Sequence, residues 1–471
     1  MSTFPSLYIT ANRVDAQGAF ATAQAAFLSP HPDTVAELDA LLQANNVGVV
    51  AHFYMDAELQ GILSACTHPH IFVADSLLMA DHAVKMVEDG VRSIVVLGVD
   101  FMSENVRAVL DSAGYTDIPV YRVDEREIGC SLAQAAESRN YIAWLQQASQ
   151  QPKSVHVVYI NTSLYSKAVA HSMVPTITCT SSNVLQTILQ VAEEIPGVTI
   201  WYGPDSYMGH NLEVMLQQMT TMSDPEIAEV HPKHNRATIQ QVLQNFQYFR
   251  QGNCIVHHMF GDTVVNTVRT EYGHAYHTAH LEVPGEMFAL AVEASKQGRG
   301  VVGSTANILH FIVDKVQEAL QVPTASHIPV VLGTESGMVT AIVRKVQQVL
   351  QHSNRADITV EIIFPVAEEA VAQDETFGVL PGVAGGEGCS TSGGCATCPY
   401  MKMNSLEALF SVLENLSAHK DMSALEPKKY QAVLGQTGKS VAQLGGQPIL
   451  FMRHFQKHKV MDPKLVALVG A

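Results

Sequence analysis

The clearest indication of the fold is the segment Ile71-Phe72-Val73-Ala74-Asp75-Ser76, an apolar run that ends in polar residues just before a helical pattern. That helical pattern spans Leu77–Val87 and repeats its apolar residues about every 3.6 positions. Two further strand-like runs, Val47–Tyr54 and Ser93–Val99, flank this pair. Strands that alternate with helices are typical of βαβ units and a parallel sheet. We therefore predict an α/β protein whose ligands bind at the carboxyl ends of the strands.

The strand endings of this first unit recur twice farther along the chain. The ending at Ser76 recurs at Ser181 and Ser304, each time before a helical pattern. The other matching endings are His52-Phe53-Tyr54, Tyr159-Ile160-Asn161 and His280-Leu281-Glu282 for the first strand, and Gly98-Val99-Asp100, Gly203-Pro204-Asp205 and Gly333-Thr334-Glu335 for the third. Such ordered repetition predicts three Rossmann-like α/β units, each with a small parallel sheet, related by a pseudo-threefold axis around a central active site.

The repeats also set the expected domain boundaries. We place an N-terminal extension at residues 1–34 and the first α/β unit at 35–150. The second unit covers 151–250, and the third, with a cysteine-containing loop, covers 251–413. Residues 414–471 form a C-terminal extension that matches no pattern we can interpret.

The composition restricts the class of protein. The 471 residues are 47% hydrophobic and 15% charged, which excludes a disordered chain. The net charge of −17 argues against nucleic-acid or anionic membrane partners, and no apolar stretch reaches the roughly 18 residues of a spanning helix. The first 30 residues contain one basic residue, Arg13, and lack the apolar core of a secretory signal. We expect a cytoplasmic location, with organelle targeting as the weaker alternative.

Three of the seven cysteines indicate a metal centre. Cys130, Cys254 and Cys398 each follow one of the repeated units, and three thiolates around a threefold axis suit a metal site. A structural zinc ion requires four ligands, whereas a [4Fe–4S] cluster held by three thiolates keeps one iron open for substrate. The spacing is not a local motif and is only suggestive. Cys66 and Cys179 are interpreted as small buried apolar residues.

The remaining cysteines leave an alternative open. Cys395-Ala396-Thr397-Cys398 is a C-x-x-C motif beside the Gly/Ser-rich loop Pro381–Gly394, and Cys389 lies within that loop. These residues favour a thiol switch, or a non-catalytic redox or metal sensor. A nucleotide-binding enzyme is a third hypothesis, weakened because no G-x-G-x-x-G or G-x-x-x-x-G-K-[ST] motif follows a strand.

The strand endings supply the candidate pocket residues, most of which are neutral hydrogen-bond donors. They are His52, Tyr54, Ser76, Tyr159, Asn161, Ser181, His280, Glu282, Ser304 and Thr305. Such donors at helix N-termini bind anionic groups without arginine, although each serine could instead be only a helix N-cap. Glu282, the only acidic residue at a first-strand end, is the candidate general base. Asp100, Asp205 and Glu335 rank lower because they could cap loops or pair with Lys402, and Lys167 or Lys402 could assist anion binding.

Several of these motifs resemble the quinolinate synthase family, in its longer branch that includes eukaryotic members. The matching motifs are Ala51-His52-Phe53-Tyr54, Ala74-Asp75-Ser76-Leu77, Tyr159-Ile160-Asn161-Thr162-Ser163 with Lys167, Thr180-Ser181-Ser182-Asn183, Gly203-Pro204-Asp205, Cys254-Ile255-Val256-His257, Gly303-Ser304-Thr305, Gly333-Thr334-Glu335-Ser336-Gly337-Met338 and Cys398-Pro399-Tyr400-Met401-Lys402-Met403-Asn404. They cover roughly Val35 to Leu413. The family's His-Pro-Glu-Cys motif reads His280-Leu281-Glu282-Val283 here, which keeps the histidine and the glutamate.

The resemblance implies a specific reaction. Members of the family are transferases that condense iminoaspartate with dihydroxyacetone phosphate to quinolinate, phosphate and water in NAD synthesis. By resemblance, Cys130, Cys254 and Cys398 bind a [4Fe–4S] cluster whose open iron is a Lewis acid. The resemblance assigns catalysis to Glu282, Tyr54 and His52. It assigns substrate binding to His52, Ser76, Tyr159, Asn161, Ser181, His280, Glu282, Ser304 and Thr305. The implied partners are L-aspartate oxidase or dehydrogenase upstream and the iron–sulfur assembly machinery.

Overall fold

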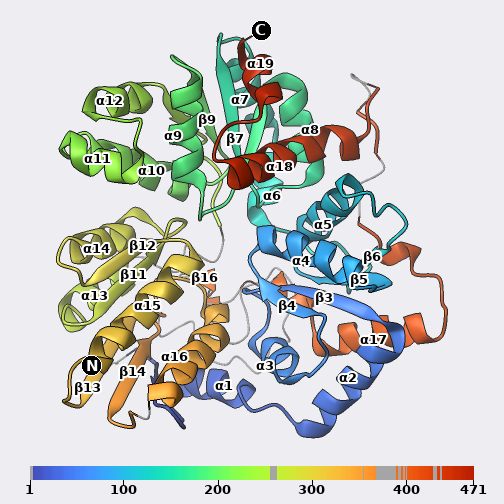
Figure 1. Cartoon of the computed structure of the whole chain (residues 1–471), viewed down its shortest axis with the longest axis vertical. Coiled ribbons are helices and arrows are strands. Elements are labelled where there is room, and N and C mark those ends of the chain that lie inside the picture. The colour runs from blue at the N-terminus through green and yellow to red at the C-terminus, as the bar shows by residue number, and fades with distance from the viewer. Residues whose placement is uncertain are drawn as a thin grey trace.

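The computed structural model describes residues 4–254, 262–353, 355–366, 389–390, 394–395, 398, 400–427, 432–434 and 438–470. Three α/β units lie around a common centre (Figure 1), the first in blue, the second in green and the third in yellow and orange. Each unit contributes its own sheet, and most residues of the parallel strands are buried.

The first unit contains a four-stranded parallel sheet in the order β4-β3-β5-β6. Its strands are β3 (Val47–His52), β4 (Ile71–Ala74), β5 (Ser93–Leu97) and β6 (Val120–Tyr121). Its helices are α3 (Ala57–Ala65), α4 (Ser76–Glu88), α5 (Asp100–Ser112), α6 (Ser131–Ala136) and α7 (Arg139–Ser149). The strand β3 is buried at every position, which explains its continuous apolar sequence.

The second unit repeats this topology, with β8 beside β7, then β9 and β10. Its strands are β7 (Ser154–Tyr159), β8 (Thr176–Cys179), β9 (Thr199–Gly203) and β10 (Phe246–Tyr248). Its helices are α8 (Leu164–Met173), α9 (Val184–Glu194), α10 (Ser206–Met219), α11 (Asp224–Val230) and α12 (Arg236–Gln244).

The third unit has the same order again, β12-β11-β13-β14. Its strands are β11 (Tyr276–His280), β12 (Gly300–Gly303), β13 (Ser326–Val331) and β14 (Ile358–Ile363). Its helices are α13 (Asp262–Glu271), α14 (Gly285–Ser295), α15 (Thr305–Leu320), η2 (Ser336–Met338) and α16 (Val339–Ser353). In every unit the second strand pairs with the first, and the first pairs with the third. The predicted set of related Rossmann-like α/β units with small parallel sheets is therefore confirmed.

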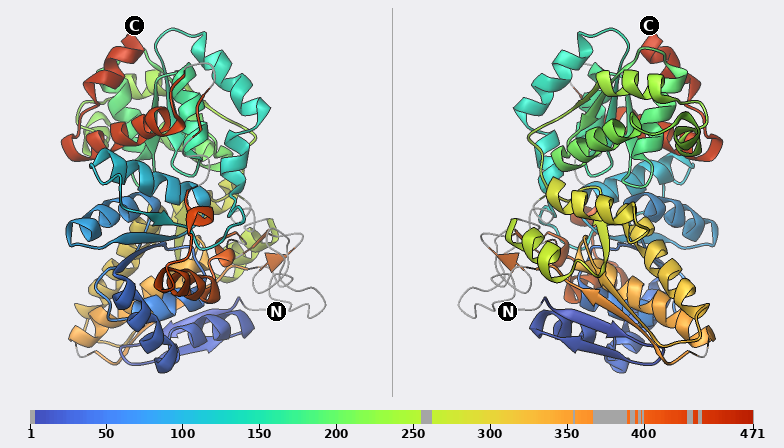
Figure 2. Two further views of the ribbon diagram at one scale, coloured as in Figure 1. Left: turned by 90° about the vertical axis from the view of Figure 1, so that its right-hand side faces the viewer. Right: turned by 90° about the vertical axis from the view of Figure 1, so that its left-hand side faces the viewer.

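The N-terminal segment extends the third sheet. The strands β1 (Ser6–Ile9) and β2 (Val14–Gln17) form an antiparallel hairpin, and β1 pairs antiparallel with β14. Figure 2 shows this hairpin beside the orange strands of the third unit. The helices α1 (Ala19–Phe27) and α2 (Pro32–Asn45) then lead into the first unit. Within residues 1–34, which we expected to form an extension, the strands β1 and β2 thus join the sheet of the third unit.

The C-terminal segment packs across two units. The helix α17 (Leu406–Ser417) packs on α2, and α18 (Val441–His458) packs on α8 and β8 of the second unit (Figures 1 and 2). The remaining elements are β15 (Cys389–Ser390), β16 (Gly394–Cys395), η4 (Met401–Met403), η5 (Ser423–Leu425) and α19 (Pro463–Gly470). Across the described ranges, no helix is long and apolar enough to cross a bilayer.

Candidate active site

The strand registers bring the predicted pocket residues to equivalent sheet edges. His52 pairs with Ala74, Tyr159 with Cys179, and His280 with Gly303, each at the last position of its strand. The polar residues that follow these pairs therefore lie together at the carboxyl edge of their own sheet. They include Tyr54 and Ser76 in the first unit, Asn161 and Ser181 in the second, and Glu282, Ser304 and Thr305 in the third.

Two of these strand ends carry the same histidine turn. The amide of Tyr54 donates to Nδ1 of His52 at 3.1 Å, and the amide of Glu282 donates to Nδ1 of His280 at 3.3 Å. Because an amide can only donate, Nδ1 of each ring is the acceptor, and each neutral ring therefore carries its proton on Nε2. Burial lowers the pKa of His52 to about 4, although the nearby Glu282 opposes this shift. His52 is therefore a neutral hydrogen-bond donor near pH 7.

Glu282 lies buried between the second and third units. The hydroxyl of Tyr159 donates a hydrogen bond to Oε1 of Glu282, and Nδ1 of His280 lies 3.9 Å from the same oxygen. Burial, and then the charge of Glu282, raises the pKa of Tyr159 well above 10, so its phenol keeps its proton. The hydroxyl of Tyr54 lies 3.3 Å from Oγ1 of Thr334. His52, Tyr54, Tyr159, His280 and Glu282 are thus brought together.

The third-strand carboxylates belong to the same neighbourhood but differ in their pairing. Asp100 forms an ion pair with the buried Arg122 at 2.9 Å. Asp205 accepts the amide of Met208 at 3.0 Å, as a helix cap, and its other oxygen has no hydrogen-bond partner among the described residues. One carboxylate oxygen of Glu335 is likewise buried without a hydrogen-bond partner among the described residues. Burial, and then the charge of Glu282, raises the pKa of both Asp205 and Glu335 well above the ordinary value.

Asp205 caps α10, as the lower-ranked interpretation allowed, and both Asp205 and Glu335 also lie near the charge of Glu282. Their strand-end positions match those of the other units, and this repetition is the signal that could have placed them beside Glu282. The sequence does not show that, of these three carboxylates, only Asp100 has a buried arginine as its ion-pair partner among the described residues.

The three predicted metal-binding cysteines share this neighbourhood. Burial raises the pKa of Cys130 to about 11 and also raises that of Cys398, and Cys130 and Glu335 add to the effect at Cys398. The charge of Cys254 contributes to the raised pKa of Tyr54, which burial dominates. Cys66, Cys130, Cys179, Cys254 and Cys398 form no disulfide. Each of the three thiols therefore lies close to Tyr54 or to a buried carboxyl group of this site.

The donor set fits an iron–sulfur cluster. Backbone amides of Leu132 and Ala133 donate to Cys130, and those of Tyr400 and Met401 donate to Cys398. Amides that point at sulfur stabilise a thiolate and tune cluster potential. In the described ranges, no three His, Cys, Asp or Glu side chains converge on a single metal ion. A cluster does not need such convergence, because each thiolate binds a different iron.

The other cysteines differ in their surroundings. Cys179 is fully buried in β8, as predicted. Cys66 is only partly buried, contrary to our expectation, because it ends α3 and bonds to the Asp39 carboxylate. The backbones of Cys389 and Cys395 are register partners in the hairpin of β15 and β16. Residues 367–388, Ala396 and Thr397 lie outside the described residues, and so do the motif residues 255–257 and Pro399.

The predicted serines have different local roles. Asp75, not Ser76, caps α4, because its carboxylate accepts the amides of Leu77 and Leu78. Ser181 precedes α9, whose N-cap is Asn183. Ser304 does cap α15, through a capping box with Asn307, and Thr305 follows it. The interpretation as a helix cap therefore holds only for Ser304.

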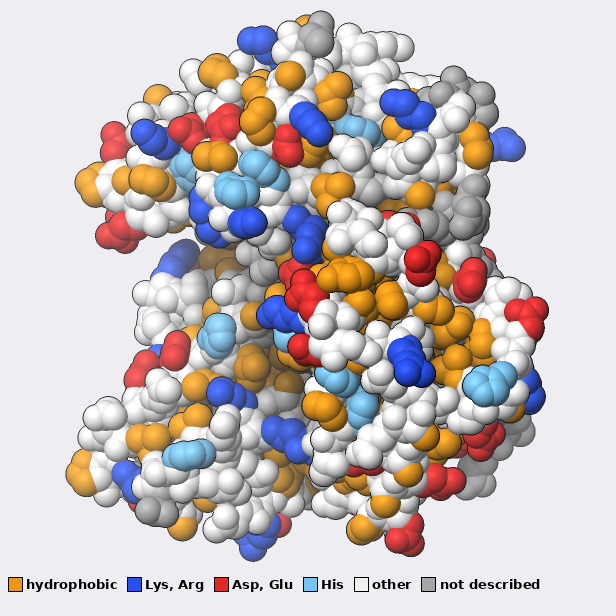
Figure 3. Space-filling view, turned by 45° about the vertical axis from the view of Figure 1, so that its right-hand side comes forward, with side chains coloured by type: hydrophobic (Ala, Val, Ile, Leu, Met, Phe, Trp, Pro, Cys, Tyr) orange, Lys and Arg blue, Asp and Glu red, His pale blue; other side chains and the backbone are white. Residues whose placement is uncertain are grey.

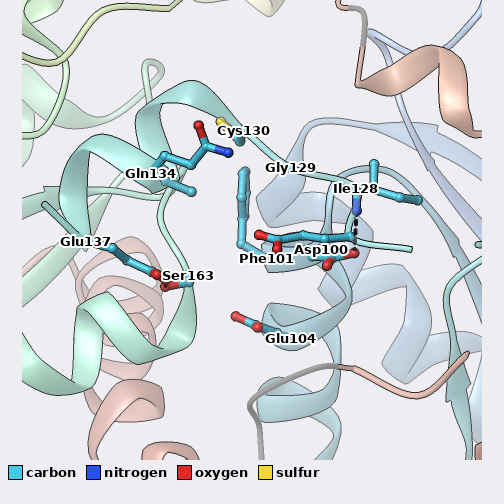
Figure 4. A pocket seen from close by; sticks show the side chains of 11 residues that line it. Asp100, Phe101, Glu104, Ile128, Gly129, Cys130, Gln134, Glu137 and Ser163 are labelled. Carbon is cyan, nitrogen blue, oxygen red and sulfur yellow. Dashed lines mark hydrogen bonds between the residues drawn. The ribbon is translucent and has the colours of Figure 1, made fainter. Parts of the chain in front are cut away.

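A small cavity of about 60 Å³ lies against Cys130, between α5 of the first unit and α6 (Figure 4). Glu104, Asp100 and Phe101 line one side, and Gln134, Glu137 and Ser163 line the other. Ser163 donates to Glu137 at 2.6 Å. Because its charged groups are acidic, this cavity does not suit an anionic substrate.

Comparison with known proteins assigns the family. Residues 36–433 match the family model described as quinolinate synthetase A protein, which is most of the chain. The chain belongs to the quinolinate synthetase A protein family. This confirms the resemblance drawn from the strand-end motifs.

Curated members of the quinolinate synthetase A family support the same assignment. A protein named "Quinolinate synthase, chloroplastic" from Nicotiana tabacum is 52% identical over 98% of this chain, and the chain spans 66% of that protein's length. The protein of the same name from Oryza sativa is also 52% identical over 98% of this chain, and 68% of its own length is covered. A quinolinate synthase from Ehrlichia chaffeensis is 25% identical over 84% of this chain and 96% of its own length.

Proposed function

We propose that this protein is a quinolinate synthase, which condenses iminoaspartate with dihydroxyacetone phosphate to quinolinate, phosphate and water in the synthesis of NAD. Family membership and the names of the curated relatives support the activity. The observation that carries the proposal is the position of Glu282, which accepts a hydrogen bond from Tyr159 of another unit and lies close enough to Cys130 to add to the raised pKa that burial gives this thiol. Glu282 is the general base and later the general acid of the condensation.

The neutral donors of the site suit two small anionic substrates. His52 and His280 offer Nε2–H groups, and the phenols of Tyr54 and Tyr159 stay protonated because burial raises the pKa of both. Ser76, Thr305 and Ser304 lie at helix N-termini, which attract carboxylate and phosphate groups. Asn161 and Ser181 complete the substrate contacts from the second unit. Local donors therefore offset the net charge of −17.

Cys130, Cys254 and Cys398 would hold the [4Fe–4S] cluster in this proposal. When bound, the cluster supplies a Lewis-acid iron that no protein thiolate occupies. The raised pKa of Cys130 means that this thiol is protonated when no cation is near. Loading therefore releases protons, and we infer that iron–sulfur assembly proteins carry it out.

The chemistry of the substrate implies an upstream partner. Iminoaspartate must be supplied by oxidation of L-aspartate, by an oxidase or a dehydrogenase. We expected a cytoplasmic location from the sequence, with organelle targeting as the weaker alternative. The names of the tobacco and rice proteins include "chloroplastic", which supports the organelle alternative.

Anaerobic purification followed by iron analysis and an assay for quinolinate tests this function. We expect a brown protein with about four irons per chain that forms quinolinate from the two substrates. A protein that changes thiol state and metal content with redox potential but has no turnover would instead be the sensor considered above. An iron-free preparation that makes quinolinate would reject the cluster.

A further inference from the structure

The turn that carries Tyr54 is held by a buried glutamine. Nε2 of Gln60, the fourth residue of α3, donates to the carbonyl of Phe53 at 2.6 Å and to that of Met55 at 3.1 Å. These two carbonyls flank Tyr54. The same nitrogen also donates to the carbonyl of Gly337 in the third unit at 2.8 Å.

The turn that carries Asn161 is held in the same way by a lysine. Nζ of Lys167, the fourth residue of α8, donates to the carbonyls of Ile160, at 3.1 Å, and Thr162. These carbonyls flank Asn161. Lys167 follows Asn161 by the same number of positions as Gln60 follows Tyr54, so the arrangement repeats with the unit. Lys167, which we considered for anion binding, therefore contacts the backbone of a site turn.

The third unit has no donor at the equivalent position of its own helix, but a residue from another unit makes the same contacts. The fourth residue of α14 is Phe288, whose side chain has no hydrogen-bond donor. Asn211, from α10 of the second unit, takes its place. Its Nδ2 donates to the carbonyls of Leu281 and Val283, both at 2.9 Å, and these carbonyls flank Glu282.

We propose that Gln60, Lys167 and Asn211 are positioning residues that fix Tyr54, Asn161 and Glu282 by bridging the two carbonyls on either side of each. Their exposed fractions are 2%, 0% and 1%, so water cannot replace the bonds they donate. The first bond of each bridge fixes the peptide plane that precedes the residue, and the second fixes the carbonyl of the next residue, so the turn from which the side chain projects is restrained on both sides. For Asn211 this role rests on the proposed function of Glu282.

The placement of Glu282 depends on contacts between the second and third units. The second unit holds Glu282 twice, through its backbone by Asn211 and through its carboxylate by Tyr159. Asn211 and Phe288 both line a groove of about 320 Å³ between α10 and α14, and Figure 3 shows a recess between the second and third units. The general base is therefore in place only when these two units are packed together.

The test is Asn211→Leu, which keeps the number and branching of the side-chain heavy atoms and removes the donor, with Asn211→Asp as a second variant. In cluster-loaded protein we expect kcat to fall tenfold or more, while KM for both substrates stays within about threefold. Amide hydrogen exchange of residues 280–284 should become at least tenfold faster. If neither variant folds, Gln60→Leu is expected to give the same kcat loss through Tyr54.

Asn45 provides the matched control. Its Nδ2 also donates to two backbone carbonyls, those of Leu41 at 2.9 Å and Leu413 at 3.2 Å, where α2 meets α17. Asn45→Leu should lower the melting temperature but leave kcat and the exchange of residues 280–284 unchanged. Folded Asn211 or Gln60 variants with wild-type kcat, or unchanged exchange in Asn211→Leu, would overturn the proposal. A wild-type protein that makes no quinolinate, yet shows faster exchange in Asn211→Leu, would reject the proposed function and leave the bridging role intact.

Discussion

Tyr159 donates a hydrogen bond to Glu282 although the two residues are 123 positions apart and belong to different α/β units. Tyr159 ends the first strand of the second unit, and Glu282 follows the first strand of the third. This pair shows how the repeated strand ends combine into one site, because neither unit alone contains both partners.

Tyr159→Phe should slow turnover while the protein stays folded and keeps its iron. The variant removes the hydroxyl that orients the Glu282 carboxylate but keeps the ring and its packing. We expect kcat to fall about tenfold, a loss of about 1.4 kcal/mol of transition-state stabilisation, with iron content unchanged. Steady-state kinetics under anaerobic conditions measure this. Unchanged kcat would mean that Tyr159 does not orient the base.

Cys254→Ser should abolish cluster binding, because it removes one of the three thiolates that we propose as cluster ligands. Iron per chain and the visible absorbance should both fall to near zero, and turnover should disappear with them. Cys66→Ser is the matched control, since Cys66 lies at the end of α3 beside Asp39. Its iron content should equal that of the wild type. Equal iron in Cys254→Ser would remove Cys254 from the ligand set.

The third-strand carboxylates should respond differently to removal of their charge. Asp100→Asn leaves the buried Arg122 without its carboxylate, which should cost about 3 kcal/mol of unfolding free energy. Asp205→Asn keeps an oxygen for the amide of Met208, and the raised pKa means that no ionic interaction is lost. We therefore expect a change within about 1 kcal/mol for that variant. Urea denaturation measures the unfolding free energy of both variants. Equal losses in the two variants would contradict the expected difference.

Acid should destabilise the fold through buried neutral histidines. His156 hydrogen-bonds to the Tyr141 hydroxyl at 2.8 Å, and burial lowers its pKa to about 3. The unfolded chain therefore binds a proton near pH 6.5 that the folded chain binds only near pH 3. The stability that is present above pH 6.5 is accordingly lost as the pH falls. From pH 6.5 to 4.5 this one residue should cost about 2 kcal/mol.

His156→Gln tests this linkage, since glutamine does not titrate in this range. Its unfolding free energy, measured in urea at pH 6.5 and 4.5, should fall by about 2 kcal/mol less than that of the wild type. A fall equal to that of the wild type would show that His156 does not carry the effect.

The strand-end repetition was sufficient to predict the three related units. It also predicted that His52, Tyr54, Tyr159, His280 and Glu282 lie near one another. Which of two neighbouring residues caps a helix was harder to predict. Asp75 and Ser76 are both good N-caps, and only the backbone geometry shows that Asp75 has that role. Long-range partners could not be predicted. The pairing of Ser6 with Ile363, and the replacement of a local donor by Asn211 of another unit, depend on how distant segments pack.

The central claim is that Glu282 performs acid–base catalysis in a cluster-containing site built by all three units. Glu282→Gln keeps the size of the side chain and an oxygen that can accept from Tyr159, but it cannot exchange the catalytic proton. Quinolinate formation should be measured in anaerobic Glu282→Gln together with its iron content. We predict about four irons per chain and a rate at least about a hundredfold below that of the wild type. A wild-type rate of quinolinate formation by this variant would contradict the account.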